Sequence, residues 1–144
     1  MPLCTGLWME TFDTNVIVRL LVEDDLQQSA IALRKWRTAL DGGGVFLPKL
    51  VLAEAVWVLR MSYRFDRQAI AGVLGALLRT EGLTIEDEPL VLVALDAYAV
   101  GGADFSDYLI LETARAASAL PVHTFDRHFA RHAEVLLMGH ETDS

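Results

Sequence analysis

Short apolar runs alternate along this chain with longer segments in which apolar residues recur every three or four positions. Short runs rich in β-branched and aromatic residues indicate strands, whereas the longer spacing indicates helices. The predicted strands are a first strand that ends at residues 11–12, and residues 45–47, 83–85, 122–125 and 135–138. The predicted helices are 16–22, 29–40, 49–62, a helix that Asp66 caps and that runs to about residue 80, 90–100 and 107–119. This alternation predicts an α/β fold in which a central, mainly parallel sheet of four to five strands lies between helices.

The chain is expected to form one domain. Its 144 residues match the usual size of a single core, and no repeat, low-complexity tract or long Pro/Gly linker divides it. We therefore predict a domain over residues 9–140, preceded by an N-terminal extension, residues 1–8, and followed by a short tail, residues 141–144.

The composition limits the possible classes of protein. Hydrophobic residues make up 53% of the chain, more than a small monomer needs, which favours an apolar oligomer face. The most apolar stretches, 50–61 and 90–100, are each too short to span a bilayer, and each contains a carboxylate. Cys4 is the single cysteine, so an internal disulfide framework is excluded and a reducing, cytoplasmic setting is expected.

The formal net charge of −8 is ambiguous. A protein that follows long nucleic acids along their phosphates is normally basic, so the charge by itself argues against nucleic acid. The same charge also results when acids are gathered to hold divalent cations. The positions of the acids have to decide between these two interpretations.

Two aspartates directly follow predicted strands. Asp13 comes after the first strand and Asp126 after the fourth, which places both at the carboxyl edge of the sheet, where open α/β folds bind ligands. Each could instead cap the short helix that follows, a common role of aspartate. For either residue alone, the structural and the functional interpretation carry equal weight.

Two further acids lie on predicted helices. Glu54 interrupts a helix that is apolar on nearly every side, and a carboxylate on a buried helix needs a cation, a hydrogen-bond network or a raised pKa. An ion pair with an arginine is the structural alternative. Asp107 opens a later helix. There Ser106 or Asp104 could be the cap, and Asp107 only a favourable charge in the first turn.

Four carboxylates from separate segments indicate a divalent-metal site. In one pocket they would repel one another and raise each other's pKa unless a cation neutralised them. Carboxylate oxygens suit Mg²⁺ or Mn²⁺, ions that keep several waters and bind substrate phosphates. Such ions activate water and stabilise the leaving oxygen of a phosphodiester, so the pattern favours metal-assisted phosphodiester hydrolysis.

The segments around these acids resemble the PIN-domain family, and specifically its VapC-type toxin ribonucleases. The similarity runs from about Met9 to Met138. The segments that carry it are Phe12-Asp13-Thr14-Asn15-Val16, the helix with Glu54, Ala103-Asp104-Phe105-Ser106-Asp107, and Thr124-Phe125-Asp126. Each is a weak motif alone, and the set in this order is specific.

The resemblance implies a PIN-like three-layer α/β/α fold and a set of metal ligands. Asp13 and Asp107 would be the principal ligands, and Glu54 and Asp126 would complete the acidic cluster. Asp104 matches a further acid that many VapC-like sequences carry, so the third acid of the site could be Asp104 instead of Asp107. We favour Asp107, because the acid of the family immediately precedes a helix, and the predicted helix here begins with Tyr108-Leu109-Ile110.

The resemblance also implies how the site is supported and what binds the protein. Thr14, Asn15 and Thr124 match small polar positions that orient the metal ligands. The implied activity is that of an Mg²⁺- or Mn²⁺-dependent endoribonuclease, the toxin of a toxin–antitoxin pair. Its partners would be an RNA substrate, a cognate VapB-type antitoxin and a second copy of the chain in a homodimer.

Two other functions fit parts of the pattern. A phosphatase of the haloacid-dehalogenase type also starts from an aspartate after a strand, but its second aspartate, two residues on, is Asn15 here, and no clear phosphate-binding lysine follows. The other alternative is a catalytically inactive PIN-like scaffold that only binds a partner or RNA. The complete set of four acids disfavours a scaffold, and binding of Mn²⁺ would distinguish the two.

Several other residues are interpreted as structural. His128 and His132 are four positions apart, as in some metal sites, but no third ligand accompanies them, so a solvated helix face is favoured. Trp36 and Trp57 have the spacing of packing residues. Four cations are interpreted as an ordinary polar face, with an RNA path as the alternative. They are Arg34, Lys35, Arg37 and Lys49.

Overall fold

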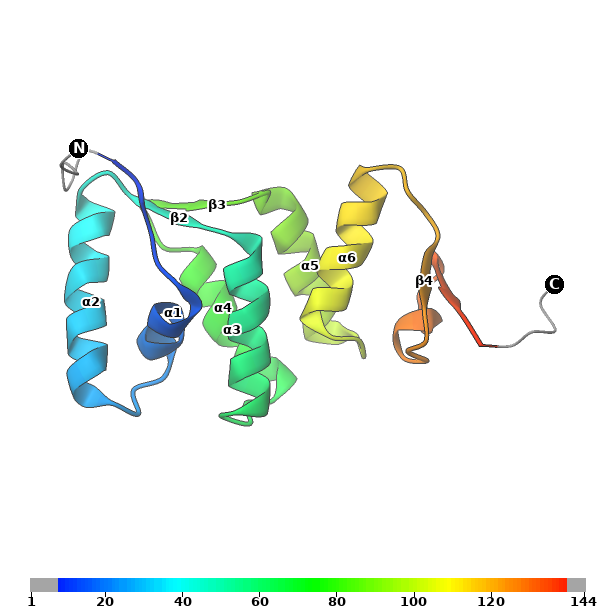
Figure 1. The fold of residues 1–144 in the computed structure, drawn as a ribbon, viewed down its shortest axis with the longest axis horizontal. Coiled ribbons are helices and arrows are strands. Elements are labelled where there is room, and N and C mark those ends of the chain that lie inside the picture. The colour runs from blue at the N-terminus through cyan, green and yellow to red at the C-terminus, as the bar shows by residue number, and fades with distance from the viewer. Residues whose placement is uncertain (1–7, 140–144) are drawn as a thin grey trace. The chain divides into compact units, whose positions relative to one another are not determined.

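The computed structural model describes residues 8–139, which form two compact units (Figure 1). Unit 1 ends at Glu88 and unit 2 begins at Pro89, and each is described by itself. The expected tail and most of the expected N-terminal extension lie outside the described residues. Among residues 8–139, no helix has the length and apolarity that a membrane span requires.

Unit 1 contains three parallel strands joined by helices. Its elements are β1 (Glu10–Thr11), α1 (Thr14–Leu21), α2 (Leu26–Asp41), β2 (Val45–Leu47), α3 (Lys49–Met61), α4 (Arg67–Leu78) and β3 (Leu83–Ile85). The strand order is β1-β2-β3, with Thr11 opposite Phe46 and Phe46 opposite Thr84. Parallel neighbours need a crossover connection, which α1 and α2 supply between the first two strands and α3 and α4 between the next two.

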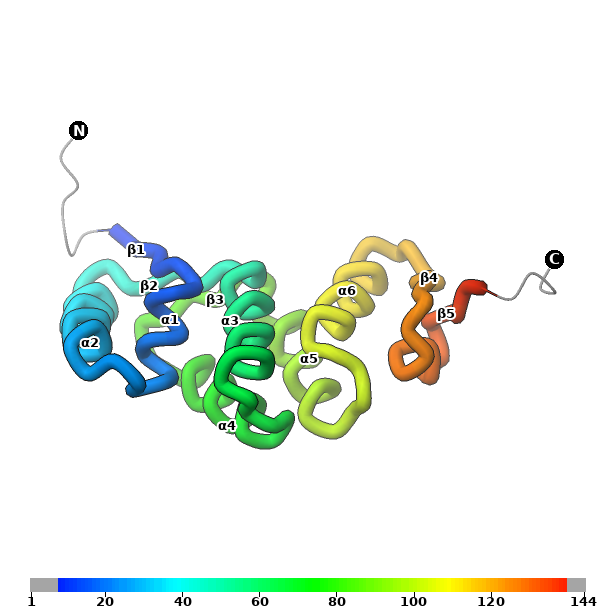
Figure 2. The backbone as a smooth tube through the Cα atoms, turned by 60° about the horizontal axis from the view of Figure 1, so that its bottom comes forward, coloured from blue at the N-terminus to red at the C-terminus, as the bar shows by residue number. Residues whose placement is uncertain are grey.

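Unit 2 is entered through α5 (Glu88–Val100), which begins at the boundary. It continues with α6 (Phe105–Ala116), β4 (Val122–Thr124), the 3₁₀ helix η1 (Phe129–Arg131) and β5 (Val135–Leu137). Strands β4 and β5 pair in parallel, with His123 opposite Leu136, and lie side by side in Figure 2. The segment between them carries η1, which begins three residues after Asp126.

The predicted α/β class with parallel strands is confirmed, but the strands do not form one sheet of four to five. Among residues 8–139, all five predicted strands are present as a three-stranded sheet and a separate pair. Local alternation predicts where a strand lies. Strand pairing depends on hydrogen bonds between distant segments, which a local pattern does not encode.

Helix starts follow aspartate caps. Asp66 Oδ1 accepts the N–H of Ala69 at 2.8 Å, as its predicted capping role requires. Asp25 Oδ1 accepts the N–H of Gln28 at 3.0 Å, so α2 starts three residues before the predicted position 29. Asp104 is the N-cap of α6, which therefore starts at 105, two residues before the predicted position 107. The acid that immediately precedes this helix is thus Asp104, so the reason given for favouring Asp107 over Asp104 is wrong.

The core of unit 1 lies where α1 and α3 pack side by side (Figure 1). Ile17, Leu52 and Leu59 are fully buried there, and burying such a side chain contributes about 1.5–3 kcal/mol. Trp36 on α2 is 6% exposed and packs edge-on against Phe12, with ring centroids 5.4 Å apart. The packing role predicted for Trp36 is confirmed.

Helix α3 is not buried on every side, contrary to the prediction. Leu50, Glu54, Trp57 and Met61 recur at helical spacing and are all exposed, Trp57 to 62%. The packing role predicted for Trp57 is therefore also wrong. A helix that is apolar all round has no polar stripe, so its sequence does not show which face the core covers.

Candidate active site

Asp13 lies between β1 and α1 and is exposed. Its Oδ1 accepts the N–H of Thr14 at 2.7 Å, and its carbonyl oxygen accepts the N–H groups of Val16 at 3.0 Å and Ile17 at 3.2 Å. Asp13 is thus the N-cap of α1, and its carboxylate stands at the carboxyl end of β1. The capping role is confirmed, and the exposure of the side chain leaves it accessible to a ligand.

Thr14 connects α1 to α3. Its side chain is buried, at 7% exposure, and its hydroxyl donates to Glu54 Oε1 at 2.7 Å. Glu54 itself is exposed, so burial does not force a cation on this carboxylate, and that part of the sequence argument is wrong. The hydroxyl instead fixes one carboxylate oxygen of Glu54 close to the first turn of α1, which Asp13 caps.

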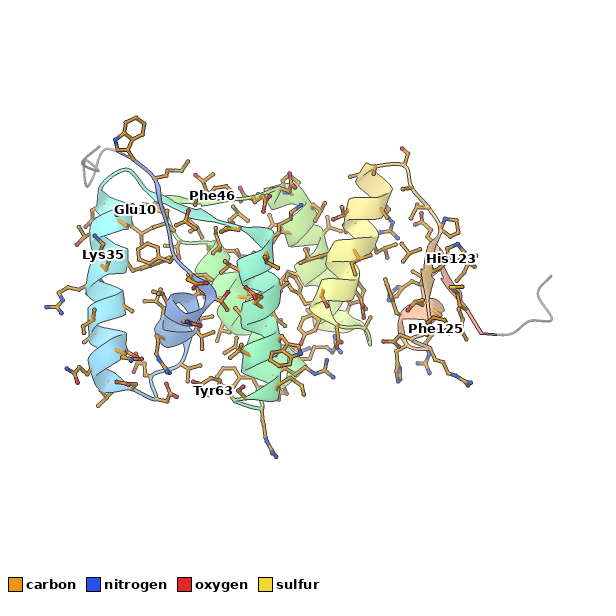
Figure 3. All side chains as sticks on the ribbon, viewed as in Figure 1. Glu10, Lys35, Phe46, Tyr63, His123 and Phe125 are labelled. Carbon is orange, nitrogen blue, oxygen red and sulfur yellow. The ribbon has the colours of Figure 1, made fainter. Side chains whose placement is uncertain are left out.

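A cavity of about 640 Å³ opens in unit 1 beside these residues. Thr14 and Asn15 line it from α1, and Ile31 and Lys35 line it from α2. The ammonium of Lys35 lies 3.7 Å from Glu10 Oε1, and Figure 3 shows these two side chains near each other. The predicted small polar residue Asn15 therefore faces a hollow next to Asp13.

Asp104 and Asp107 are joined at the first turn of α6. The backbone N–H of Asp104 donates to Asp107 Oδ2 at 3.2 Å. Asp107 is half-buried, and the pKa of its carboxyl is raised above the usual value. Burial is the largest cause, and the charges of Asp104 and Asp126 act in the same direction. The hydrogen bond from the Asp104 backbone opposes this shift without cancelling it. In unit 2, Asp107 thus lies within electrostatic reach of two other predicted acids, Asp104 and Asp126.

Asp126 organises the turn after β4. Its Oδ1 accepts the N–H of His128 at 2.8 Å and that of Phe129 at 3.3 Å, which supports η1. Its own N–H donates to Thr124 Oγ1 at 3.0 Å. The structural role considered for Asp126 is confirmed, and Thr124 holds the backbone from which this carboxylate projects.

The carboxylates are suited to a hard divalent cation by their chemistry. Among residues 8–139, no three His, Cys, Asp or Glu side chains are gathered at metal-binding range. Their oxygens are nevertheless the ligands that Mg²⁺ and Mn²⁺ prefer. The raised pKa of Asp107 reflects burial and neighbouring negative charges, and a cation would relieve both. The donor set therefore fits such an ion.

Two of the four cations considered for an RNA path are paired with acids. The ammonium of Lys49 lies 2.5 Å from Asp87 Oδ2, and Lys35 is paired with Glu10. Arg34 and Arg37 are exposed on α2. These positions agree with the interpretation of an ordinary polar face.

The two histidines near the acids differ from each other. His128 is exposed, as a solvated position requires. His132 is half-buried, and its Nε2 lies 3.1 Å from the hydroxyl of Tyr108, with the two rings edge-on at 5.1 Å. Sequence reasoning missed this contact, because its partners are 24 residues apart and neither has a distinctive local motif.

Comparison with known proteins shows the family to which this chain belongs. The family model described as "PIN domain" matches residues 11–135, which cover β1 to the start of β5. A curated relative, the protein named VapC ribonuclease from Aquifex aeolicus (strain VF5), is 25% identical over 123 residues. That alignment covers 85% of this chain and 91% of the relative. The chain therefore belongs to the PIN domain family.

Proposed function

We propose that this chain is a divalent-metal-dependent endoribonuclease of the VapC type that hydrolyses phosphodiester bonds in RNA. The observation that carries the proposal is the group of Asp104, Asp107 and Asp126, in which burial, and after it the charges of the other two carboxylates, raise the pKa of Asp107. Carboxylates whose pKa values are shifted by burial and by neighbouring charges are frequent at functional sites. The relative named a VapC ribonuclease supports RNA as the substrate.

The proposed ligands are the acids Asp13, Glu54, Asp107 and Asp126, with Asp104 as a further candidate. When bound, Mg²⁺ or Mn²⁺ would supply an activated water and stabilise charge on the leaving oxygen of the phosphodiester. The carboxylates of this chain would hold the ion, and the ion would supply the positive charge to which the phosphate binds. Their charge also repels a bare phosphate, so RNA binding at this site depends on the cation.

Three small polar residues orient these acids. Thr14 fixes Oε1 of Glu54 through its hydroxyl, and Thr124 holds the backbone N–H of Asp126. Asn15 follows Thr14 in α1 and lines the cavity. Groups of this kind limit the rotamers of a metal ligand, and their loss typically weakens metal binding about 10–100-fold.

The proposed partners follow from the VapC relationship. We expect a VapB-type antitoxin that inhibits the enzyme and a homodimer as its assembled state, in the cytoplasm. The exposed apolar side chains of Leu50, Trp57 and Met61 on α3 support a protein–protein contact, since such side chains are normally covered in assemblies.

The decisive experiment is cleavage of a mixed cellular RNA pool by purified chain with Mn²⁺. Discrete cleavage is expected, and it should be lost in EDTA and in Asp13→Asn. The matched control is Asp66→Asn, which changes another helix-capping aspartate of unit 1 and should cleave like the wild type. If well-folded, metal-replete chain without bound antitoxin cleaves no RNA, the inactive scaffold is the correct alternative.

A further inference from the structure

The hydroxyl of Tyr108 lies at the centre of a contact beside the acids of α6. Tyr108 is 2% exposed, and its hydroxyl is 3.1 Å from Nε2 of His132 and 3.4 Å from the backbone nitrogen of Ala103, whose N–H it accepts. Ala103 and Tyr108 flank Asp104 and Asp107 in the sequence. The hydroxyl therefore ties the loop before these two acids to the turn of the helix that carries them.

His132 extends this contact to the segment of the third acid. Its ring lies edge-on to Tyr108 at 5.1 Å and edge-on to Phe129 at 6.2 Å. Phe129 is 2% exposed, and its backbone N–H donates to Asp126 Oδ1 at 3.3 Å. One imidazole thus packs between the helix that carries Asp107 and the turn that Asp126 caps.

The contacts of His132 with Tyr108 and Phe129 have a physical role next to the three acids. The carboxylates of Asp104, Asp107 and Asp126 repel one another before a cation binds, so the spacing of their segments must be held by other groups. Tyr108 and Phe129 are buried, and the His132 ring packs edge-on against both and shares a hydrogen bond with the hydroxyl of Tyr108. Rigid support of this type preserves ligand geometry at little entropic cost when the ion binds.

We propose that His132 is a positioning residue, which through Tyr108 and Phe129 sets the spacing between Asp126 and the Asp104–Asp107 turn and thereby the affinity of the acids for a divalent cation. The inference rests on the proposed function, since it concerns the same cation. His132 is not a ligand in this account, because its Nε2 is occupied by Tyr108.

The test uses the full chain and compares Mn²⁺ affinity by titration calorimetry with thermal stability in EDTA. His132→Phe keeps a ring but loses the hydrogen bond, and Tyr108→Phe removes one oxygen. Both are expected to bind Mn²⁺ about tenfold more weakly. His132→Gln places a donor and an acceptor near the position of Nε2 and should restore affinity to within about threefold of the wild type. The control His128→Phe alters an exposed histidine and should bind like the wild type.

Each outcome decides a separate point. If the wild type itself binds no Mn²⁺, the proposed function fails. If it binds Mn²⁺ and Tyr108→Phe binds equally well, the positioning role is overturned while the function stands. Lower stability in EDTA with unchanged affinity also overturns it, because His132 would then only support the fold. Should His132→Phe fail to fold, the smaller Tyr108→Phe change still decides.

Discussion

The hydroxyl of Thr14 donates to Oε1 of Glu54 at 2.7 Å, which joins the first turn of α1 to the middle of α3 across 40 residues of sequence. The donor is buried and the acceptor is exposed. The bond therefore orients a carboxylate at the surface from within the core, which is the arrangement a metal ligand needs.

Replacing Thr14 by Val tests this bond directly. The variant keeps the shape of the side chain and loses the hydroxyl, and we expect the free energy of unfolding to fall by about 0.5–1.5 kcal/mol. Urea denaturation measures the change. Thr14→Ser retains the hydroxyl and should bind Mn²⁺ like the wild type, whereas Thr14→Val should bind it more weakly. Binding of Mn²⁺ by Thr14→Val that equals that of the wild type would contradict the orienting role.

Replacing Glu54 by Gln separates charge from hydrogen bonding. The amide oxygen still accepts from Thr14, so stability in EDTA should stay within about 0.5 kcal/mol of the wild type. The loss of a negative ligand should weaken Mn²⁺ binding at least tenfold, on the order of the effects seen at metal sites. The rise in melting temperature on adding Mn²⁺ reports this affinity. If Mn²⁺ raises the melting temperature of Glu54→Gln as much as that of the wild type, Glu54 is not a ligand of the ion.

Replacing Asp107 by Asn should raise the melting temperature of the metal-free protein near neutral pH. Burial first, and then the charges of Asp104 and Asp126, raise the pKa of Asp107 in the folded chain, so its ionised form opposes folding. The free-energy cost of ionising Asp107 in the folded chain is absent below the ordinary pKa of an aspartate. This cost grows as the pH rises toward the folded-state pKa and is complete above it.

The advantage of Asp107→Asn should therefore vanish as the pH is lowered to about 4 and below. Melting curves in EDTA at several pH values measure it. Asp66→Asn, the control, changes the N-cap of α4 and should show no such pH-dependent gain. An advantage for Asp107→Asn that is largest at low pH would contradict the direction of the shift.

Neutralising Arg34 and Arg37 together tests the RNA path that the sequence left open. Both are exposed on α2. If they contact phosphates, the double Gln variant should bind single-stranded RNA more weakly and reduce the slope of log K against log salt by about 0.7 per lost contact. Anisotropy titrations at several salt concentrations measure the slope. An unchanged slope makes these arginines an ordinary polar face.

Several features of this protein are local, and the sequence by itself determined them. Alternating apolar runs placed the five strands and six α-helices found among residues 8–139, because side-chain periodicity reports which residues turn toward a core. Asp13 and Asp126 were placed at strand ends by adjacency alone. Asp66 was predicted as a cap because the preference of aspartate for that position depends on its own backbone.

Other features depend on segments far apart, and only the tertiary structure decided them. The apolar α3 carries no polar stripe, so the exposure of Glu54 and Trp57 came from the packing of its neighbours. The strands form one three-stranded and one two-stranded sheet, because strand pairing depends on segments that are far apart in the sequence. His132 contacts Tyr108, which lies 24 residues earlier in the chain, and a contact between residues so far apart has no local signal in the sequence.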